Sequence, residues 1–188
     1  MIAERDVEAG PADDGLSTWD PVSFWARTRP DRLAWLGKSN GGLLMGAALT
    51  QHPDLPRAVV SHVGIYDMLR VERTANGAFN VTEFGTVEDP EQFRALFAYS
   101  PYHHVVDGTK YPSVLFLTGE NDPRVEPWQS RKMVARLQAA TPGGHPVLLR
   151  TSASSGHGIG TALGELIEEN VDVFAFLLHE LDVKIEKR

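Results

Sequence analysis

Four short runs of apolar residues, each separated from the next by a helical pattern, constrain the fold of this chain most strongly. The clearest run is SVLFLTG, residues 113–119, and the others lie within 31–37, 58–63 and 147–149. The runs are dominated by Val, Leu and Ala and do not alternate with polar residues. Strands with that composition are buried on both faces, as in a parallel sheet covered by helices. The sequence therefore predicts an α/β fold with a mostly parallel sheet of about four strands flanked by helices.

Helices are expected between and after these runs. The predicted segments are 41–51, 127–140 and 163–178, and Asp89-Pro90-Glu91 marks one further helix start. The closing helix is assigned a buried face that consists of Leu166, Ile167, Val171, Phe174 and Leu178. No strand is predicted between Tyr66 and Val106. Aromatic residues in that stretch either line a pocket or pack an irregular segment, and packing is favoured for most of Tyr66, Phe79, Phe84, Tyr99 and Tyr102.

Length and composition favour one globular domain preceded by an arm. The chain has 188 residues, of which 42% are hydrophobic and 23% charged, as in ordinary globular domains. Residues 1–30 are acidic and rich in Gly, Pro and Ser, so we assign them to an N-terminal arm and residues 31–188 to the folded domain. The tryptophans and phenylalanine of the arm, Trp19, Phe24 and Trp25, indicate that it docks on another surface.

Charge and residue types exclude several classes of partner. The formal net charge of −7 argues against nucleic acid and anionic membranes. The absence of cysteine removes disulfides, thiolate metal sites and cysteine nucleophiles, and the adjacent His103 and His104 point apart, so we expect no metal and no cofactor. No secretory signal pattern or membrane-spanning run of ~18 apolar residues is present, from which we expect a soluble, cytoplasmic protein.

A G-x-S-x-G pattern, Gly37-Lys38-Ser39-Asn40-Gly41, lies between the first predicted strand and the following helix. In that context a serine is held on a sharp turn with its hydroxyl exposed. We expect Gly37 and Gly41 to permit the close approach of strand and helix, and the backbone N–H of Asn40 to point where an oxyanion would form. Ser39 is therefore a candidate nucleophile, and a plain strand-to-helix turn is the alternative.

Two more polar motifs follow later strands. Asp122 lies in GENDPRV, directly after residues 113–119, and His157 lies in SGHG, after the last strand. Taken alone, Asp122 is a helix cap near Pro127, and His157 is a solvated loop residue. Taken together, a serine, an acid and a histidine, each after its own strand and in this order, are typical of α/β-hydrolases. The sequence therefore predicts a serine hydrolase.

These motifs carry a resemblance to a known family. From about Asp31 to Leu178 the chain resembles the catalytic domain of the prolyl oligopeptidase family of serine peptidases. The similar segments are SNGGLL, GENDPRV and SGHG, and between them AVVSHVGIYDMLR, FGTVEDPEQF and YSPYHHV. The resemblance implies that Ser39 is the nucleophile, that His157 is the general base and acid, and that Asp122 orients the imidazole.

The resemblance also implies two substrate-binding residues, and the chain differs from the family in two respects. Arg124 matches an arginine that binds a substrate carbonyl, and Asn40 matches the position whose backbone N–H binds the oxyanion. Lys38 stands where family members usually have a third glycine, and a long lysine can point to solvent. Members also have a β-propeller and the first half of the hydrolase sheet before the nucleophile strand. That half supplies a tyrosine to the oxyanion hole, and losing one donor costs ~10²–10³ in rate.

With only 38 residues before Ser39, the nucleophile strand is expected at an exposed edge of the sheet. An unpaired apolar edge invites pairing with another chain. We therefore predict a homo-oligomer, most simply a two-fold dimer, formed through this edge or through the N-terminal arm.

The leading functional hypothesis is a serine hydrolase that acts through an acyl-enzyme on short-chain carboxylic esters, with small peptides as a second substrate class. An open site with a weakened oxyanion hole favours activated esters over peptide bonds. One alternative is a catalytically inactive remnant that serves as a folded or dimeric scaffold; its histidine would lie beyond hydrogen-bond reach of Ser39. Another is a fragment that needs a partner chain to supply the rest of the sheet.

Overall fold

The computed structural model describes residues 30–141, 143–158 and 160–185. The predicted arm, residues 1–30, lies outside these residues except for its last position, and so do Trp19, Phe24 and Trp25. The division into an arm and a folded domain therefore stays a prediction.

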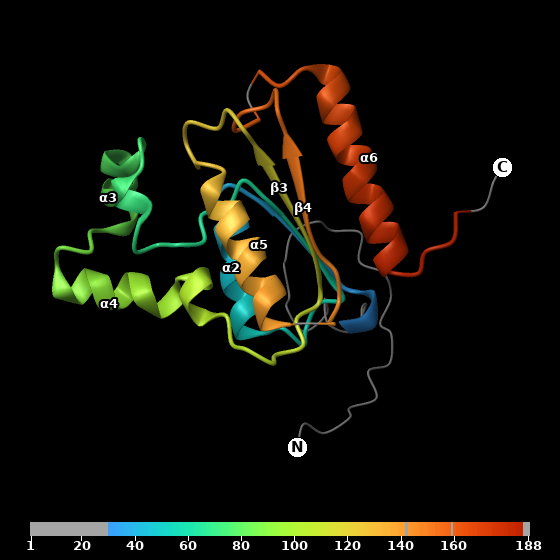
Figure 1. Ribbon diagram of the computed structural model, residues 1–188, viewed down its shortest axis with the longest axis horizontal. Helices are drawn as coiled ribbons and strands as arrows, with labels where there is room; N and C mark the ends of the chain where they lie inside the picture. Colours follow the sequence, from blue (N-terminus) through green and yellow to red (C-terminus); the bar gives the residue numbers. More distant parts are fainter. Residues whose placement is uncertain (1–29, 142, 159, 186–188) are drawn as a thin grey trace, which may run out of the picture.

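Four parallel strands form one sheet in the order β1-β2-β3-β4 (Figure 1). They are β1 (Ala34–Lys38), β2 (Ala58–His62), β3 (Ser113–Gly119) and β4 (Val147–Ser152). Every residue of β3 is buried, as its unbroken apolar run predicts. The predicted α/β class, with about four mostly parallel strands, is confirmed. Since the strands are parallel, their carboxyl ends all lie at one edge of the sheet, where β1 ends at Lys38 and β3 at Gly119.

Helices cover the two faces of the sheet unequally (Figure 1). One face carries α2 (Asn40–Gln51) and α5 (Trp128–Ala140), and the other carries α6 (Leu163–Glu180) alone. Between β2 and β3 the chain forms α3 (Gly77–Phe84) and α4 (Pro90–Tyr99), which extend beyond the sheet. Short 3-10 turns occur at Pro30–Arg32, Val71–Arg73 and Pro101–His104. Within the part of the chain that is described, no helix has the length and apolarity needed to cross a membrane.

The start of α4 and the existence of α3 can be compared with what the sequence predicts. The predicted start of α4 is confirmed, because the Asp89 carboxylate accepts the backbone N–H groups of Glu91 and Gln92. In contrast, α3 is not predicted by periodicity. It is a helix of eight residues with Gly77 at its start, and short helices of this kind are held by tertiary contacts rather than by propensity.

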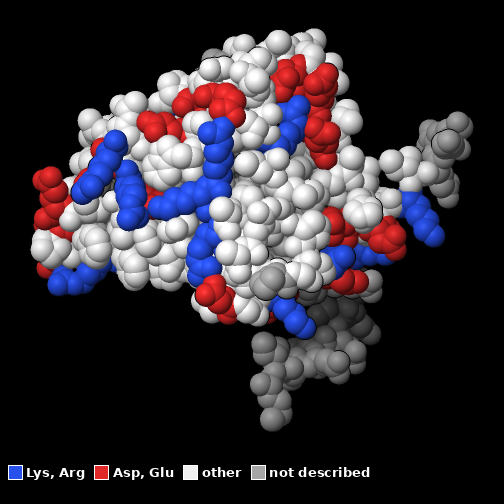
Figure 2. Space-filling view, viewed as in Figure 1, with Lys and Arg blue, Asp and Glu red and all other residues white. Residues whose placement is uncertain are grey.

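Charged side chains occupy part of the α6 face, where Figure 2 shows acidic and basic groups mixed over β4 and α6. Arg150 of β4 donates hydrogen bonds to Asp172 and Glu165 at 2.6 and 3.0 Å and lies 3.5 Å from Glu169. At the other end of α6, the Ser113 hydroxyl donates to the Glu180 carboxylate at 2.6 Å. These bonds fix α6 on β4 and β3.

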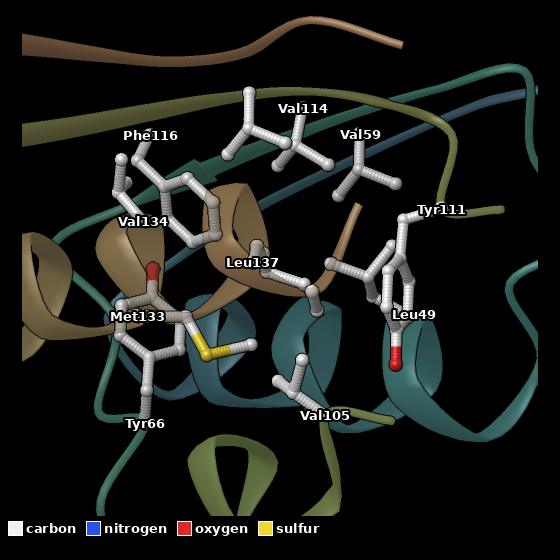
Figure 3. Packing of buried hydrophobic residues seen from close by; sticks show 12 residues of the cluster. Leu49, Val59, Tyr66, Val105, Tyr111, Val114, Phe116, Met133, Val134 and Leu137 are labelled. Carbon is white, nitrogen blue, oxygen red and sulfur yellow. The ribbon is translucent and has the colours of Figure 1, made fainter. Parts of the chain in front are cut away.

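The main hydrophobic core lies between the sheet and the α2/α5 layer (Figure 3). Leu49 of α2 and Met133 of α5 pack with Val59 and Phe116 of the central strands, and none of these side chains is exposed. The rings of Tyr66 and Phe116 are almost perpendicular, with centroids 5.2 Å apart. This core holds α2, and with it the turn at Ser39, against the sheet.

The predicted buried face of α6 is wrong at three of its five positions, and the other two, Leu166 and Leu178, are half-buried. Ile167, Val171 and Phe174 are 55%, 60% and 59% exposed, whereas the buried apolar side chains of the helix are Val173 and Phe176. The helix is apolar on more than one side, and only the side that meets β2 and β3 is covered. Together with Leu163, the three exposed residues follow helical spacing and form an apolar stripe of α6.

Candidate active site

Ser39 lies on a strained turn between the end of β1 and the start of α2. Its φ and ψ are 56° and −118°, a left-handed conformation that side-chain-bearing residues rarely adopt. The Ser39 backbone N–H donates to the His62 carbonyl at 2.8 Å, and its carbonyl accepts the N–H of Leu43 at 3.1 Å. The turn is thus fixed to β2 on one side and to α2 on the other, in the geometry of a nucleophile elbow.

Glycines permit this turn, but the second one differs from the expectation. A Cβ on Gly37 would collide with the backbone carbonyl of Gly41. A Cβ on Gly41 would point into open space, whereas one on Gly42 would collide with the backbone of Gly64. The close approach therefore depends on Gly37 and Gly42, and Gly41 contributes only its backbone.

His157 and Asp122 complete a hydrogen-bonded row with Ser39. His157 Nε2 lies 2.8 Å from Ser39 Oγ, and His157 Nδ1 lies 2.7 Å from Asp122 Oδ2. The three residues follow β4, β3 and β1, so the parallel order of the strands brings together side chains that are 118 and 35 positions apart in sequence. The structure thus places the three predicted residues within hydrogen-bond reach of one another.

The Asp122 carboxylate binds both its own loop and His157, but it does not cap α5, whose N-cap position Pro127 has no side-chain cap. Its Oδ1 accepts the backbone N–H groups of Arg124 and Val125, each at 2.9 Å, while its Oδ2 faces His157. Burial by itself would raise the pKa of Asp122, but the hydrogen bonds from His157 and from the two N–H groups outweigh burial and hold the pKa below its usual value. The carboxylate is therefore charged at neutral pH and held in one orientation.

Asn40 begins α2, so its backbone N–H has no acceptor within the helix and lies next to Ser39. Its side chain donates from Nδ2 to Glu83 Oε1 of α3 at 2.7 Å. Asn40 thus connects the turn to α3. Together with the packing of Phe84 against the buried cluster that contains Leu43, this contact holds α3, which no periodic pattern predicts, beside the site.

A cavity of about 290 Å³ opens beside Ser39. Among the predicted residues, Asn40, Arg124 and His157 line it with Ser39, and no described residue pairs with the Arg124 guanidinium. Of the five aromatic residues weighed in the sequence, Phe79 and Phe84 line the cavity, whereas Tyr66 belongs to the core. Sequence reasoning missed other lining residues, which are Ile65, Asn76, Asn80, Glu83 and Val125.

Beneath the site, at the ends of β1 and β2, lie Lys38 and His62. Lys38 is exposed, and its ammonium lies against Gly158, next to His157. His62 Nε2 is 3.8 Å from Glu169 Oε2. Burial, followed by the positive charge of Lys38, lowers the pKa of His62 to about 4, so the imidazole is neutral at pH 7. Within the described ranges, no group of three or more His, Asp and Glu side chains is arranged to hold a metal ion.

The chain is similar in sequence and fold to known proteins. The family model described as the prolyl oligopeptidase family matches residues 3–184. The chain is 42% identical over 158 residues to a prolyl endopeptidase of Elizabethkingia miricola, covering 84% of this chain and 22% of that protein. A prolyl endopeptidase of Dictyostelium discoideum is 40% identical over 161 residues, again 84% of this chain and 21% of the relative.

Solved structures show the same relation. A prolyl endopeptidase structure superposes with a TM-score of 0.81 at 45% identity, over 84% of this chain and 23% of the other. Oligopeptidase B from Trypanosoma brucei gives a TM-score of 0.80 at 29% identity, over 86% of this chain and 23% of the other. The chain therefore spans about a fifth to a quarter of the length of the proteins that it matches.

Proposed function

The chain belongs to the prolyl oligopeptidase family, and on that basis we propose that it is a serine hydrolase that acts through an acyl-enzyme. The observation that carries the proposal is the hydrogen-bonded row of Ser39, His157 and Asp122. The inactive-remnant alternative expects His157 to be out of reach of Ser39, and the distance of 2.8 Å argues against it.

The proposed mechanism uses each side chain at a stated atom. Ser39 Oγ attacks the substrate carbonyl while His157 Nε2 takes its proton, and Asp122 holds the Nδ1–H side of the ring. The oxyanion of the tetrahedral intermediate accepts the Asn40 N–H. His157 then gives the proton to the leaving alcohol or amine. A water molecule, deprotonated by the same nitrogen, attacks the acyl-enzyme, and the acid and free Ser39 are released.

As substrates we propose short-chain carboxylic esters first and small peptides second. Relatives are prolyl endopeptidases, which supports a peptide, but this chain spans about a fifth of their length. Among the described residues we assign one oxyanion donor, the Asn40 N–H, and a hole with one donor fewer costs ~10²–10³ in rate. Activated esters need less of this stabilisation because their leaving groups depart readily.

A two-fold dimer is proposed as the assembly. Strand β1 pairs with β2 on one side and has no strand partner on its other side among the described residues. Leu36 on β1 is 61% exposed. Leu36 lies on the α6 side of the sheet, because Ala34 two residues earlier packs there. A second copy would bring the same edge and the same apolar stripe of α6, which suits a self-complementary interface. The cytoplasmic location stays a prediction.

The test of the proposed function is intact-mass labelling with a small fluorophosphonate. The probe requires an activated serine and little substrate recognition. We expect one adduct per chain, lost in Ser39→Ala and kept in Ser154→Ala, which removes an exposed serine in the loop before His157. A folded chain that gains no adduct would overturn the proposal and favour the inactive remnant.

A further inference from the structure

Asn80 is a buried polar residue in the wall of the Ser39 cavity. It lies on α3 and is 4% exposed, and it lines the same cavity as Ser39 and His157. Its Nδ2 is buried and has no hydrogen-bond partner among the described residues. Buried amide N–H groups are nearly always paired, because an unpaired one loses its bonds to water without replacement. An unpaired donor in the wall of a ligand cavity therefore indicates a group that a ligand satisfies.

The position of Asn80 relative to Ser39 is fixed. Asn80 continues the α3 helix by donating its backbone N–H to the Asn76 carbonyl at 3.1 Å. One turn later, Glu83 accepts the side chain of Asn40, the residue directly after Ser39. The Asn40–Glu83 bond thus ties the helix that carries the unpaired amide to the turn that carries the nucleophile.

The rest of the cavity defines what fits against this amide. Ile65, Phe84 and Val125 give it an apolar wall. With a volume of about 290 Å³ it lies at the small end of ligand cavities, which suits one side chain. Glu83 and Arg124 contribute one charge of each sign, so the cavity has no excess charge that would select an ionised group.

We propose that Asn80 is a specificity-determining residue, whose Nδ2 donates a hydrogen bond to a neutral acceptor oxygen on the acyl side of the substrate. The favoured acyl group has a short side chain that ends in a carbonyl, as in asparagine, next to the bond that is broken. This inference rests on the proposed function, since it concerns the same cavity and the same acyl-enzyme.

The preference for one substrate side chain over another depends on whether that side chain gives the Asn80 amide a hydrogen-bond acceptor. An apolar side chain of the same shape would leave Nδ2 unpaired, whereas a carbonyl oxygen would supply the acceptor that the described residues do not provide. Sites built to hydrogen-bond a substrate group reject the analogue that lacks it far more strongly than apolar pockets reject a change of size. For a single neutral hydrogen bond, we expect a preference of about 10-fold in kcat/KM.

The experiment compares p-nitrophenyl esters of N-acetyl-asparagine and N-acetyl-leucine, whose side chains have nearly the same shape. Rates are corrected with Ser39→Ala, and labelling by the fluorophosphonate is measured in the same samples. We expect the wild-type chain to prefer the asparagine ester about 10-fold and Asn80→Leu, which keeps the volume, to prefer the leucine ester. Asn80→Ala removes the preference if the leucine variant does not fold. The matched control is Asn170→Ala, an exposed asparagine of α6, which should keep the wild-type ratio.

The outcomes separate the two proposals. A wild-type chain that is labelled and cleaves both esters with no preference, or with a preference for leucine, overturns the role of Asn80 and leaves the serine hydrolase standing. An unchanged ratio in both Asn80 variants also overturns it. A chain that is neither labelled nor active removes the proposed function, and the inference about Asn80 falls with it.

Discussion

The two faces of the sheet are built from similar apolar residues but are held in different ways. On the α2/α5 face, Leu49, Phe116 and Met133 are fully buried in one continuous core. On the other face, α6 buries Val173 and Phe176 but leaves its apolar stripe exposed, and charged groups around Arg150 fix it instead. The difference teaches that an apolar helix face predicts burial only where a second element covers it. Four predictions test this comparison, from the largest expected effect to the smallest.

The most direct test makes one substitution on each face. Phe116→Ala should lower the free energy of unfolding by about 3–5 kcal/mol, because it empties a packed site in the main core. Phe174→Ala, the same change at a residue that is 59% exposed, should stay within about 0.5 kcal/mol when both variants are measured at a concentration low enough to keep the chain monomeric. Urea denaturation followed by far-UV circular dichroism measures both. Equal losses would show that α6 is covered in solution and would contradict the comparison.

His62, on the α6 side at the end of β2, should make stability depend on pH. Its pKa is lowered to about 4 by burial and then by Lys38, so between about pH 6.5 and pH 4 the unfolded chain binds a proton that the folded chain does not. The contribution of His62 is therefore fully present above pH 6.5 and is lost as the pH falls towards 4.

The size of this loss is at most about 3 kcal/mol, from the 1.36 kcal/mol that one pKa unit represents. His62→Gln should flatten the fall in stability between pH 7 and pH 4, measured by urea denaturation at each pH. His52→Gln, at an exposed histidine, should leave the fall as in the wild-type chain. The titratable and charged groups that face His62 are Lys38, Arg150, Glu169, Asp122 and His157. If His62→Gln leaves the loss of stability between pH 7 and pH 4 unchanged, these groups and not His62 cause that loss.

Arg150 tests the charged contacts of α6. Arg150→Met should cost about 2 kcal/mol at pH 7, because Glu165, Asp172 and the buried Glu169 lose their cation. Burial already raises the pKa of Glu169, and Arg150 opposes that rise, so the deficit of the variant should shrink as acid protonates Glu169. Thermal unfolding at pH 5 and pH 7 measures the difference. Arg131→Met, which breaks the exposed pair with Glu120, should change stability by no more than about 0.5 kcal/mol.

The apolar stripe of α6 should matter for assembly and hardly at all for the folded chain. Val171→Lys places a charge at a residue that is 60% exposed, so we expect a stability change within about 0.5 kcal/mol and a shift from dimer to monomer. Sedimentation velocity over a range of concentrations measures the shift. Glu168→Lys, at an exposed position of the same helix that is not in the stripe, serves as the control. A wild-type chain that remains monomeric at high concentration would sink the proposed dimer.

The sequence by itself determined the frame of this protein. The unbroken apolar run of residues 113–119 coincides with β3, Asp89 caps α4 as expected, and Ser39, Asp122 and His157 each follow a different strand. These features are local, since strand burial, helix capping and turn chemistry depend on neighbours in the chain. The order of the motifs then places the three side chains at one edge, because parallel strands have their carboxyl ends together.

Only the tertiary structure decided which surfaces are covered and what lines the site. It placed the unpredicted helix α3 beside Ser39 through the Asn40–Glu83 bond, and with it the unpaired amide of Asn80. It shows that the close approach of the turn requires a glycine at position 42 and not at position 41, and that Phe174 is exposed to solvent. Periodicity reports which side of an element is apolar, but burial and hydrogen bonding depend on elements far away in sequence, and no local pattern encodes their distance.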